Sequence, residues 1–424
     1  MKRSLFPLLF SLVSLYAFSQ DSDTKNILSD SISALQLSEI PAFSISNDIS
    51  ETESQGVSGL LQSSGDVFSR ITSYGFRSAR FRTRGYNSDN FEVMINGVQM
   101  NDPEFGRAIY SIWGGLNDVT RNPLVKTGIN SSQVTFGGIG GISNINARPT
   151  SIRTGSKISY ARSNRSYSNR LMITHATGMM GNGLAVSLSG SWRYAKEGYV
   201  AGSFYDAASY YMGIEKKIND KHTIGIIGMG APTKRGKQGI ALQEAYDLSG
   251  TNYYNPYWGY QNGEKRNSRV VDSHKPIFML NHYWKKSEVM NITSGLYYST
   301  GKYGQSSLNW DDAEDPRPDY YRYLPSYYEE DNKIQYAYLT DQWTNNESFR
   351  QVDWDRLYNG NYKNLYTVEN ADGSGSSLTG NRSKYIVEQW RNDPTLIGFN
   401  SNFNTKLSTK LKASGGVDIS MYKS

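Results

Sequence analysis

The sequence predicts two structures in succession: a small mixed α/β domain, then the antiparallel strands of a transmembrane β-barrel that is incomplete. Three observations lead to this fold class. Beyond Thr150, long segments alternate apolar and polar residues, as in strands with one face toward lipid. Aromatic residues make up 13% of the chain, including 32 Tyr, and both interfaces of such a barrel require amphipathic aromatics. The first residues, finally, resemble those of exported proteins.

The N-terminus has the three parts of a secretory signal peptide. Met1-Lys2-Arg3 is cationic, Leu5 to Phe18 is mostly apolar, and Ala17-Phe18-Ser19 is a small-x-small cleavage pattern. We therefore assign residues 1–19 to a signal peptide. Residues 20–55 are rich in Ser, Asp and Glu and have no sustained period, which predicts a flexible segment.

Residues 56–150 read as the small mixed domain, because short apolar runs alternate with Gly, Asn, Asp and Pro. Asn96-Gly97 stands between alternating hydrophobic residues, which predicts a tight hairpin. The glycines at 137, 138, 140 and 141 allow backbone to pack against backbone. A phosphate-binding loop is the alternative for these glycines. It is disfavoured because Ser143 stands where the dinucleotide fingerprint needs Gly, and no Walker lysine follows.

Residues 151–424 read as about nine barrel strands. In one of them Leu184, Val186 and Leu188 alternate with serines, and the segment from Leu411 to Met421 repeats this pattern. Short turns (219–221, 285–288 and around Ser408) alternate with long connections (233–272 and 303–393), as between the two ends of a barrel. Plugged transporters have 22 strands, so we expect a fragment of a larger barrel. A soluble β-sandwich is the alternative, but its outward face would be polar and its strands shorter.

Composition narrows the possible chemistry. The chain has no Cys, which removes disulfides and thiolate sites, and its net charge of +6 is scattered, which argues against nucleic acid. Four His residues show no zinc spacing, so we expect no metal site and no metalloenzyme. Calcium at the carboxylates of Asp311, Asp312, Glu314 and Asp315 is conceivable without EF-hand spacing, and a solvated loop is the alternative.

Residues 84–145 carry an ordered set of motifs. Arg84-Gly85 precedes an apolar run, Ile95 to Val98 reads "INGV", and Asn101 to Pro103 reads "NDP". Asn117 to Gly128 is expected to be a helical piece that ends in an apolar strand and Gly, and Phe136 to Ile145 reads "FGGIGGISNI". In this order they resemble the plug domain of TonB-dependent outer-membrane receptors. Two positions differ: Asn96 replaces the more usual Asp, and "GGLNDVTRN" replaces an acidic run. These differences bear on the substrate subclass.

The resemblance implies active transport, without an enzymatic step or a cofactor, of a scarce nutrient (an iron chelate, a vitamin or a glycan fragment) across a bacterial outer membrane. The implied partners are the TonB protein on the periplasmic side, the nutrient and outer-membrane lipid. Ile40 to Ile45 is either the TonB box or the first strand of the plug. Two other functions stay open: a structural or adhesive barrel without energised transport, and a secreted glycan-binding or glycan-cleaving β protein.

The resemblance also suggests which residues contact the substrate. We expect them in two apical plug loops, where charged and aromatic groups together would hold an organic ligand: Asn101, Asp102, Glu104, Phe105, Arg107, Tyr110 and Trp113, then Asn130, Ser131, Ser132 and Gln133. The alternative for each is that it holds the plug to the barrel. For Arg80, Arg82 and Arg84 we favour ion pairs between plug and barrel.

Overall fold

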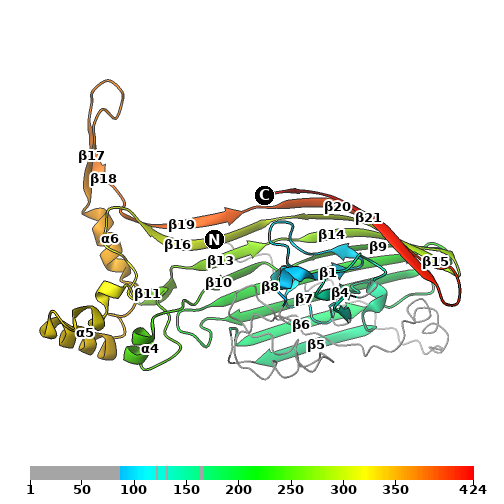
Figure 1. Cartoon of the computed structure of the whole chain (residues 1–424), viewed down its shortest axis with the longest axis horizontal. Coiled ribbons are helices and arrows are strands. Elements are labelled where there is room, and N and C mark those ends of the chain that lie inside the picture. Colours follow the sequence, from blue (N-terminus) through cyan, green and yellow to red (C-terminus); the bar gives the residue numbers. More distant parts are fainter. Residues whose placement is uncertain (1–85, 121–122, 130–131, 163, 165) are drawn as a thin grey trace. The chain divides into compact units, whose positions relative to one another are not determined.

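The computed structural model describes residues 86–424 except 121–122, 130–131, 163 and 165 (Figure 1). The signal peptide, the segment to residue 55, the possible TonB box, Arg80, Arg82 and the Arg84-Gly85 step lie outside the described residues, as do Asn130 and Ser131. The described residues belong to one compact unit.

Residues 86–150, here called the inner domain, contain a four-stranded mixed sheet in the order β2-β1-β4-β3. Strand β1 is parallel to β4, and the other pairs are antiparallel. The turn between β1 and β2 places Asn96 at φ 51° and Gly97 at φ 83°, as a two-residue hairpin requires. The described part of this domain has no α-helix, only short 3-10 turns. The elements are β1 (Phe91–Ile95), β2 (Val98–Gln99), β3 (Pro123–Thr127), β4 (Gly141–Ile145), η3 (Ser88–Asn90), η4 (Tyr110–Trp113) and η5 (Pro149–Ser151).

The remaining long strands form one large sheet of 13 segments, all paired antiparallel. Within the described residues β5 pairs with β6 alone and β21 with β20 alone, so the sheet is open. This confirms the predicted fold class. The segments are β5 (Gly155–Arg162), β6 (Asn169–Ala176), β7 (Leu184–Ala195), β8 (Tyr205–Lys217), β9 (His222–Gly230), β10 (Thr233–Gly236), β13 (Val270–His274), β14 (Ile277–Ser287), β15 (Met290–Thr300), β16 (Lys302–Trp310), β19 (Tyr385–Asn392), β20 (Thr395–Lys406) and β21 (Lys412–Lys423).

Four long strand paths are interrupted at one common level, here called the seam. β9 and β10 are separated by two residues ending in Pro232, β13 and β14 by two ending in Pro276, β15 and β16 by Gly301, and β19 and β20 by two ending in Pro394. The 13 segments therefore follow nine strand paths. Proline has no N–H to give to a ladder, so at three of the four breaks a continuous strand would leave a bond unmade. At the fourth break, the Gly301 N–H donates to the Pro394 carbonyl.

Replacing Gly301 by Ala at the seam is expected to destabilise the sheet. A Cβ at this position would lie 2.0 Å from the carbonyl oxygen of His274, which is backbone and cannot rotate away. We expect a loss of about 2 kcal/mol in unfolding free energy, typical of overpacking. Urea unfolding followed by tryptophan fluorescence measures it. Gly380→Ala is the control because a Cβ there meets nothing within 4 Å; equal shifts in both variants would contradict the argument.

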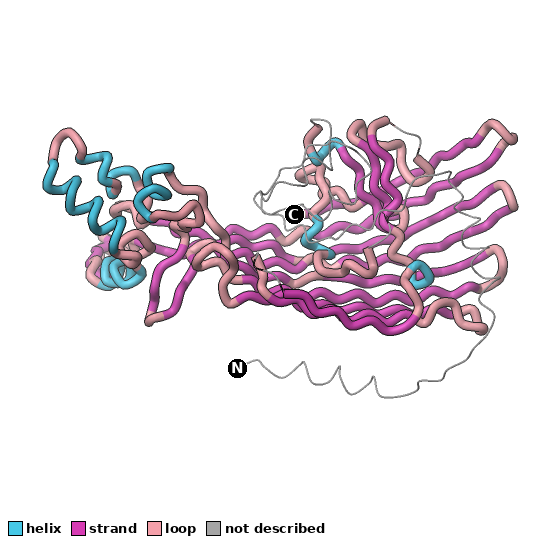
Figure 2. Tube along the Cα trace, turned by 90° about the horizontal axis from the view of Figure 1, so that it is seen from below, coloured by secondary structure: helices cyan, strands magenta, loops and turns pink. Residues whose placement is uncertain are grey.

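The inner domain packs on one face of the large sheet (Figure 2), and that face carries both polar and apolar side chains. On β7, Ser187, Ser189 and Arg193 are buried, whereas Leu188 and Trp192 on the opposite face are 46% and 47% exposed. The core between the two sheets is apolar all the same, because the inner domain supplies most of it. Its buried members include Val93, Ile95, Val98, Trp113, Leu116, Val119 and Ile145 from the inner domain and Tyr211, Ile227, Met229, Ile277, Met279 and Tyr297 from the large sheet.

The two long connections are shorter than expected and have structure of their own. Strands β10, β13, β16 and β19 occupy their ends, because the strands continue past the seam. Residues 237–269 and 311–384, here called the loop module, gather at the end of the sheet away from the short turns (Figure 1). The module contains α4 (Gln243–Ser249), β11 (Trp258–Gln261), β12 (Glu264–Asn267), η6 (Tyr321–Tyr323), η7 (Pro325–Tyr328), α5 (Lys333–Asn345), α6 (Trp354–Tyr362), β17 (Leu365–Val368) and β18 (Leu378–Asn381).

The loop module has its own hydrophobic core. Trp343 on α5 is fully buried against Ala245, Tyr254 and Leu324, and its ring centre lies 5.6 Å from that of Tyr254. This contact joins the two connections. The module also contains 15 of the 32 Tyr, so the aromatic excess that suggested interfacial girdles belongs in large part to these loops.

Among the described helices, none combines the length and the apolar character needed to cross a membrane.

Candidate functional site

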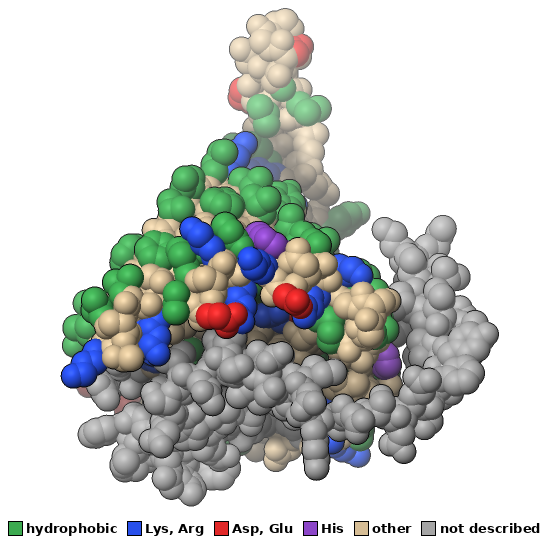
Figure 3. Space-filling view, turned by 90° about the vertical axis from the view of Figure 1, so that its right-hand side faces the viewer, with side chains coloured by type: hydrophobic (Ala, Val, Ile, Leu, Met, Phe, Trp, Pro, Cys, Tyr) green, Lys and Arg blue, Asp and Glu red, His purple; other side chains and the backbone are tan. Residues whose placement is uncertain are grey.

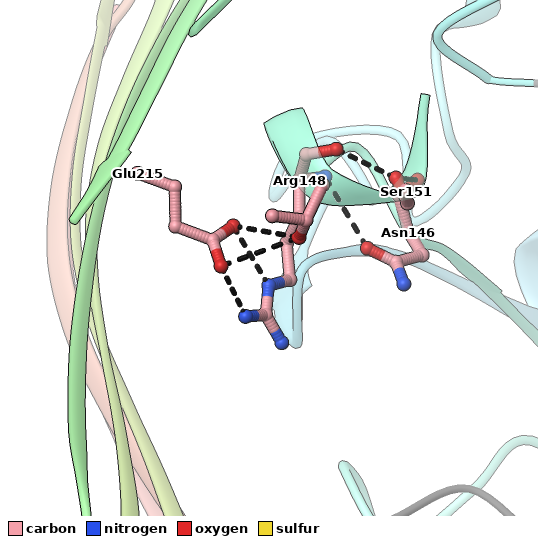
Figure 4. A network of polar contacts seen from close by, with 5 residues as sticks. Asn146, Arg148, Ser151 and Glu215 are labelled. Carbon is pink, nitrogen blue, oxygen red and sulfur yellow. Dashed lines mark hydrogen bonds and ion pairs between the residues drawn. The ribbon is translucent and has the colours of Figure 1, made fainter. Parts of the chain in front are cut away.

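The inner domain is fixed to the large sheet by a buried ion pair between Arg148 and Glu215 (Figure 4). Arg148 Nη2 lies 2.5 Å from Glu215 Oε1, and Arg148 Nε lies 3.1 Å from Oε2. The hydroxyl of Thr150 donates to the same carboxylate, and the guanidinium lies 3.9 Å from the ring centre of Tyr283. Glu215 is 1% exposed, so this carboxylate depends on these partners instead of water.

Local structure places Arg148 for this contact. The Asn146 side chain accepts a hydrogen bond from the Arg148 N–H at 3.2 Å, and the Ser151 hydroxyl donates to the Arg148 carbonyl at 2.6 Å (Figure 4). Pro149 then begins the short turn η5. Sequence reasoning missed this pair. A signal existed, since Glu215 is the one acidic residue on the inward face of β8, which otherwise presents Tyr205, Ala207, Ser209, Tyr211 and Gly213.

A second attachment lies at the end of η4. The carbonyl of Gly114 accepts hydrogen bonds from Arg193 Nη2 at 3.0 Å and from the Ser209 hydroxyl at 2.5 Å. Gly115 follows at φ +89°, and a Cβ there would lie 2.6 Å from Ser191 Oγ. Only glycine fits between this turn and the large sheet.

The loop at 101–107 is held in shape by its first two residues. Asn101 donates to the carbonyls of Phe91 and Gly106 and accepts from the Val93 N–H, all at 2.7–2.9 Å. Asp102 accepts the N–H groups of Glu104 and Phe105, and its carboxylate lies 3.9 Å from Lys275 Nζ at the seam. These two residues therefore have structural partners within the protein.

The other predicted residues of this loop divide into exposed and buried groups. Glu104 is exposed but accepts from Asn392 at 2.9 Å and from the Tyr422 hydroxyl at 3.3 Å. Phe105, 48% exposed, and Arg107 lie at the surface. Tyr110 packs edge-on against Trp113, and burial raises the pKa of Tyr110 to about 12. Trp113 is fully buried in the core and has no surface to offer a ligand, which corrects its place among the substrate-contacting residues.

The second predicted loop lies elsewhere. The Ser132 carbonyl accepts from Ser414, and the Gln133 carbonyl from Asn404, near the short turn between β20 and β21. Asn404 stands eight residues beyond Leu396, which pairs with Tyr422, so the two attachment points are roughly 26 Å apart at ~3.3 Å per residue. The described part of this loop therefore faces the short-turn end, and substrate contact by the two loops stays a prediction.

The glycine-rich segment lies where backbone approaches backbone. A Cβ at Gly138 would lie 2.4 Å from the Asn90 carbonyl oxygen, and one at Gly140 would lie 2.5 Å from the Phe91 ring. Gly137 and Gly141 have φ values of 91° and 130°. In the turn between β1 and β2, the carbonyl of Gly97 accepts a hydrogen bond from the side chain of Asn400 on β20. These glycines position the inner domain and touch no candidate ligand surface.

The acidic loop residues considered for calcium are engaged with arginine. Asp311 pairs with Arg382 at 2.9 Å, Glu314 with Arg356 at 3.4 Å and Asp315 with Arg317 at 2.5 Å. Across residues 86–424 as described, no three His, Asp or Glu side chains converge as a metal site would require. A shallow cavity of about 700 Å³ does lie here, lined by Asp312, Glu314, Lys363, Lys384 and Tyr385 among others.

Comparison with known proteins gives structural likeness alone. No family model matches the sequence, and no curated protein does. Similar solved structures include the siderophore receptor PiuA of Acinetobacter baumannii (TM-score 0.41, 11% identity), the open form of the ferric-catecholate import receptor Fiu of E. coli K12 (0.47, 12%) and the FrpB iron transporter of Neisseria meningitidis (0.41, 12%). Each covers 80% of this chain, whereas the chain spans 55%, 43% and 42% of their lengths. The function proposed below rests on the chain's own residues.

Proposed function

We propose that this chain is the plug and part of the wall of a TonB-dependent outer-membrane receptor, which imports a scarce nutrient. One observation carries the proposal: the large sheet exposes large apolar side chains on its outer face, whereas its buried polar side chains, such as Ser187, Arg193 and Glu215, lie on the face toward the inner domain. Soluble sheets do the opposite, because their apolar face forms the core. A sheet whose exposed face is apolar on every long strand needs a hydrocarbon surrounding.

The apolar exposure extends across the whole sheet. Ile226, Leu280, Leu296 and Phe399 form one continuous exposed row over β9, β14, β15 and β20. Contiguous apolar patches of this extent are unusual on soluble monomers. This row disfavours the soluble sandwich and the secreted glycan-binding protein. A structural or adhesive barrel has the same outer face, so the choice between it and a transporter rests on the resemblance of residues 84–145 to a plug.

In the proposed receptor, the ligand reaches the inner domain from the side of the loop module. Phe105 and Arg107 are exposed side chains of the apical loop (residues 101–107), and they would offer a ring face and a guanidinium to an organic anion. TonB would act from the other side through residues 20–55. The nutrient would be an iron chelate, a vitamin or a glycan fragment.

Uptake measurements test the proposal. In a strain carrying the full-length gene, deletion of residues 20–55 behind the signal peptide is expected to abolish growth on the limiting nutrient while the protein still fractionates with the outer membrane. A shuffled sequence of the same composition in residues 20–55 is the matched control for segment length. Unchanged uptake in the deletion strain, across iron chelates, cobalamin and oligosaccharides, would refute energised transport and leave the structural barrel.

A further inference from the structure

The outward face of the large sheet changes character near the short turns. One level beyond the apolar row of Ile226, Leu280, Leu296 and Phe399, β9 still carries the apolar Ile224, whereas β14, β15 and β20 carry the cross-strand neighbours His282, Ser294 and Ser401. We call these three residues the polar row. One level further, His222, Trp284, Ile292 and Phe403 are aligned on the same four strands. From mid-sheet to turn, the surface is thus apolar, then polar, then mostly aromatic.

The two histidines form a pair. His222 Nδ1 lies 3.0 Å from His282 Nε2, and the rings are stacked with an interplanar angle of 6°. Trp284 stacks on the other side of His222, 5.5 Å between ring centres, and Lys286 Nζ lies 5.8 Å from the Trp284 ring centre. Figure 3 views the end of the molecule where Lys and Arg side chains and histidine lie beside hydrophobic side chains.

Whichever of the two histidines donates the hydrogen bond between them, one further imidazole N–H points away from the pair. If His222 Nδ1–H donates, the neutral His282 must carry its hydrogen on Nδ1; if His282 Nε2–H donates, His222 must carry its hydrogen on Nε2. The hydroxyls of Ser294 and Ser401, 2.8 Å apart, behave alike, because whichever accepts keeps its own O–H. One imidazole N–H and one hydroxyl therefore remain as donors beside the apolar row, and the Lys286 ammonium adds a positive charge further toward the turn, beyond Trp284.

A hydrogen-bond donor that faces hydrocarbon costs free energy unless an acceptor binds it. We propose that the polar row with His222 and Lys286 binds the phosphate of an anionic phospholipid whose chains lie along the apolar row. Trp284, one level beyond the polar row, would lie at the headgroup level, where tryptophan is favoured. Charge complementarity and the adjoining apolar row select a lipid phosphate over a free anion. This inference rests on the membrane location in the proposed function but not on transport.

Lipid retention tests this site. The full-length protein is purified in detergent and titrated with phosphatidylglycerol, phosphatidylcholine or inorganic phosphate, and bound lipid is counted by native mass spectrometry. We expect phosphatidylglycerol to bind in preference to phosphatidylcholine, and inorganic phosphate to compete weakly. His282→Leu combined with Ser294→Ala should weaken phosphatidylglycerol binding about tenfold, the loss expected for a hydrogen bond to a charged group.

His175→Leu is the matched control, because His175 also faces outward, on β6, where it contacts Ser156 instead of the polar row. Its lipid binding should equal that of the unchanged protein. Equal retention of phosphatidylglycerol by the double variant, or equal affinity for both lipids, overturns the proposal while the receptor assignment stands. A protein that stays soluble without detergent overturns both. Displacement of the lipid by millimolar inorganic phosphate would identify a free-anion site and overturn the lipid assignment.

Discussion

Glu215→Ala is expected to detach the inner domain from the wall. The substitution leaves the Arg148 guanidinium in a largely enclosed site without its carboxylate, and breaking a buried pair typically costs 3–5 kcal/mol. Because the Arg148 side chain keeps 30% exposure, we expect the lower end, about 3 kcal/mol. Pulse proteolysis of the full-length protein in urea measures the change, as cleavage within residues 86–150 at a lower urea concentration. Cells producing the variant should also admit large antibiotics that the sealed receptor excludes.

Two further variants separate the pair from charge in general. Glu288→Ala removes an exposed partner of Lys285 and should change stability by less than about 0.5 kcal/mol. Arg148→Met combined with Glu215→Leu removes both charges and should restore most of the lost stability, because apolar groups of similar volume replace a buried pair at little cost. If the double variant is as unstable as Glu215→Ala, the ion pair does not explain the attachment.

Trp343→Ala is expected to unfold the loop module without disturbing the sheet. Removing a fully buried tryptophan costs about 3–5 kcal/mol, and this side chain joins the two connections that form the module. We expect trypsin to cleave within residues 311–384 under conditions where the unchanged protein resists. Binding of the nutrient should fall at least tenfold if the module forms the entrance.

Trp390→Ala on β19 is the control, because the same side chain is removed at a position that is 55% exposed. It should leave both the proteolytic pattern and the binding unchanged. Cleavage of the Trp343→Ala protein at the same rate as the unchanged protein would show that Tyr254 and Leu324 hold the module together alone.

The strands of the large sheet were predictable because alternation is a local property. Leu184, Val186 and Leu188 are larger and more apolar than the Ala and Ser residues between them, and that pattern alone predicts which residues share a face. The seam was not predictable in the same way. Pro232, Pro276 and Pro394 resemble ordinary turn residues in sequence, and only the register of neighbouring strands aligns them. The fold of the loop module depends on the contact between Trp343 and Tyr254. These residues are 89 positions apart in the sequence, so no local pattern predicts their contact.

The candidate site was predictable in its motifs but not in its geometry. Asn96-Gly97 and the glycines at 138 and 140 have a local conformational or packing requirement, which the sequence reveals. The residues that attach the inner domain to the large sheet have no such local requirement. Nothing in the sequence singled out Arg148, and Trp113 and Gln133 were predicted in apical loops, because the direction of a side chain and the end of the sheet it faces are set by tertiary packing. Sequence spacing carries no information about either.

The seam also has a mechanical meaning. A continuous hydrogen-bonded ladder resists bending across its strands, and at the seam four neighbouring paths interrupt that ladder at once, so the wall consists of two stiff plates joined by a crease. The plate formed by β10, β13, β16 and β19 carries the loop module, and the plate formed by β9, β14, β15 and β20 carries the apolar row. The apical loop is fastened at the crease itself, through Asp102 to Lys275 and Glu104 to Asn392. A tilt of the strands that carry the loop module, relative to the rest of the sheet, would therefore pull on this one short loop of the inner domain.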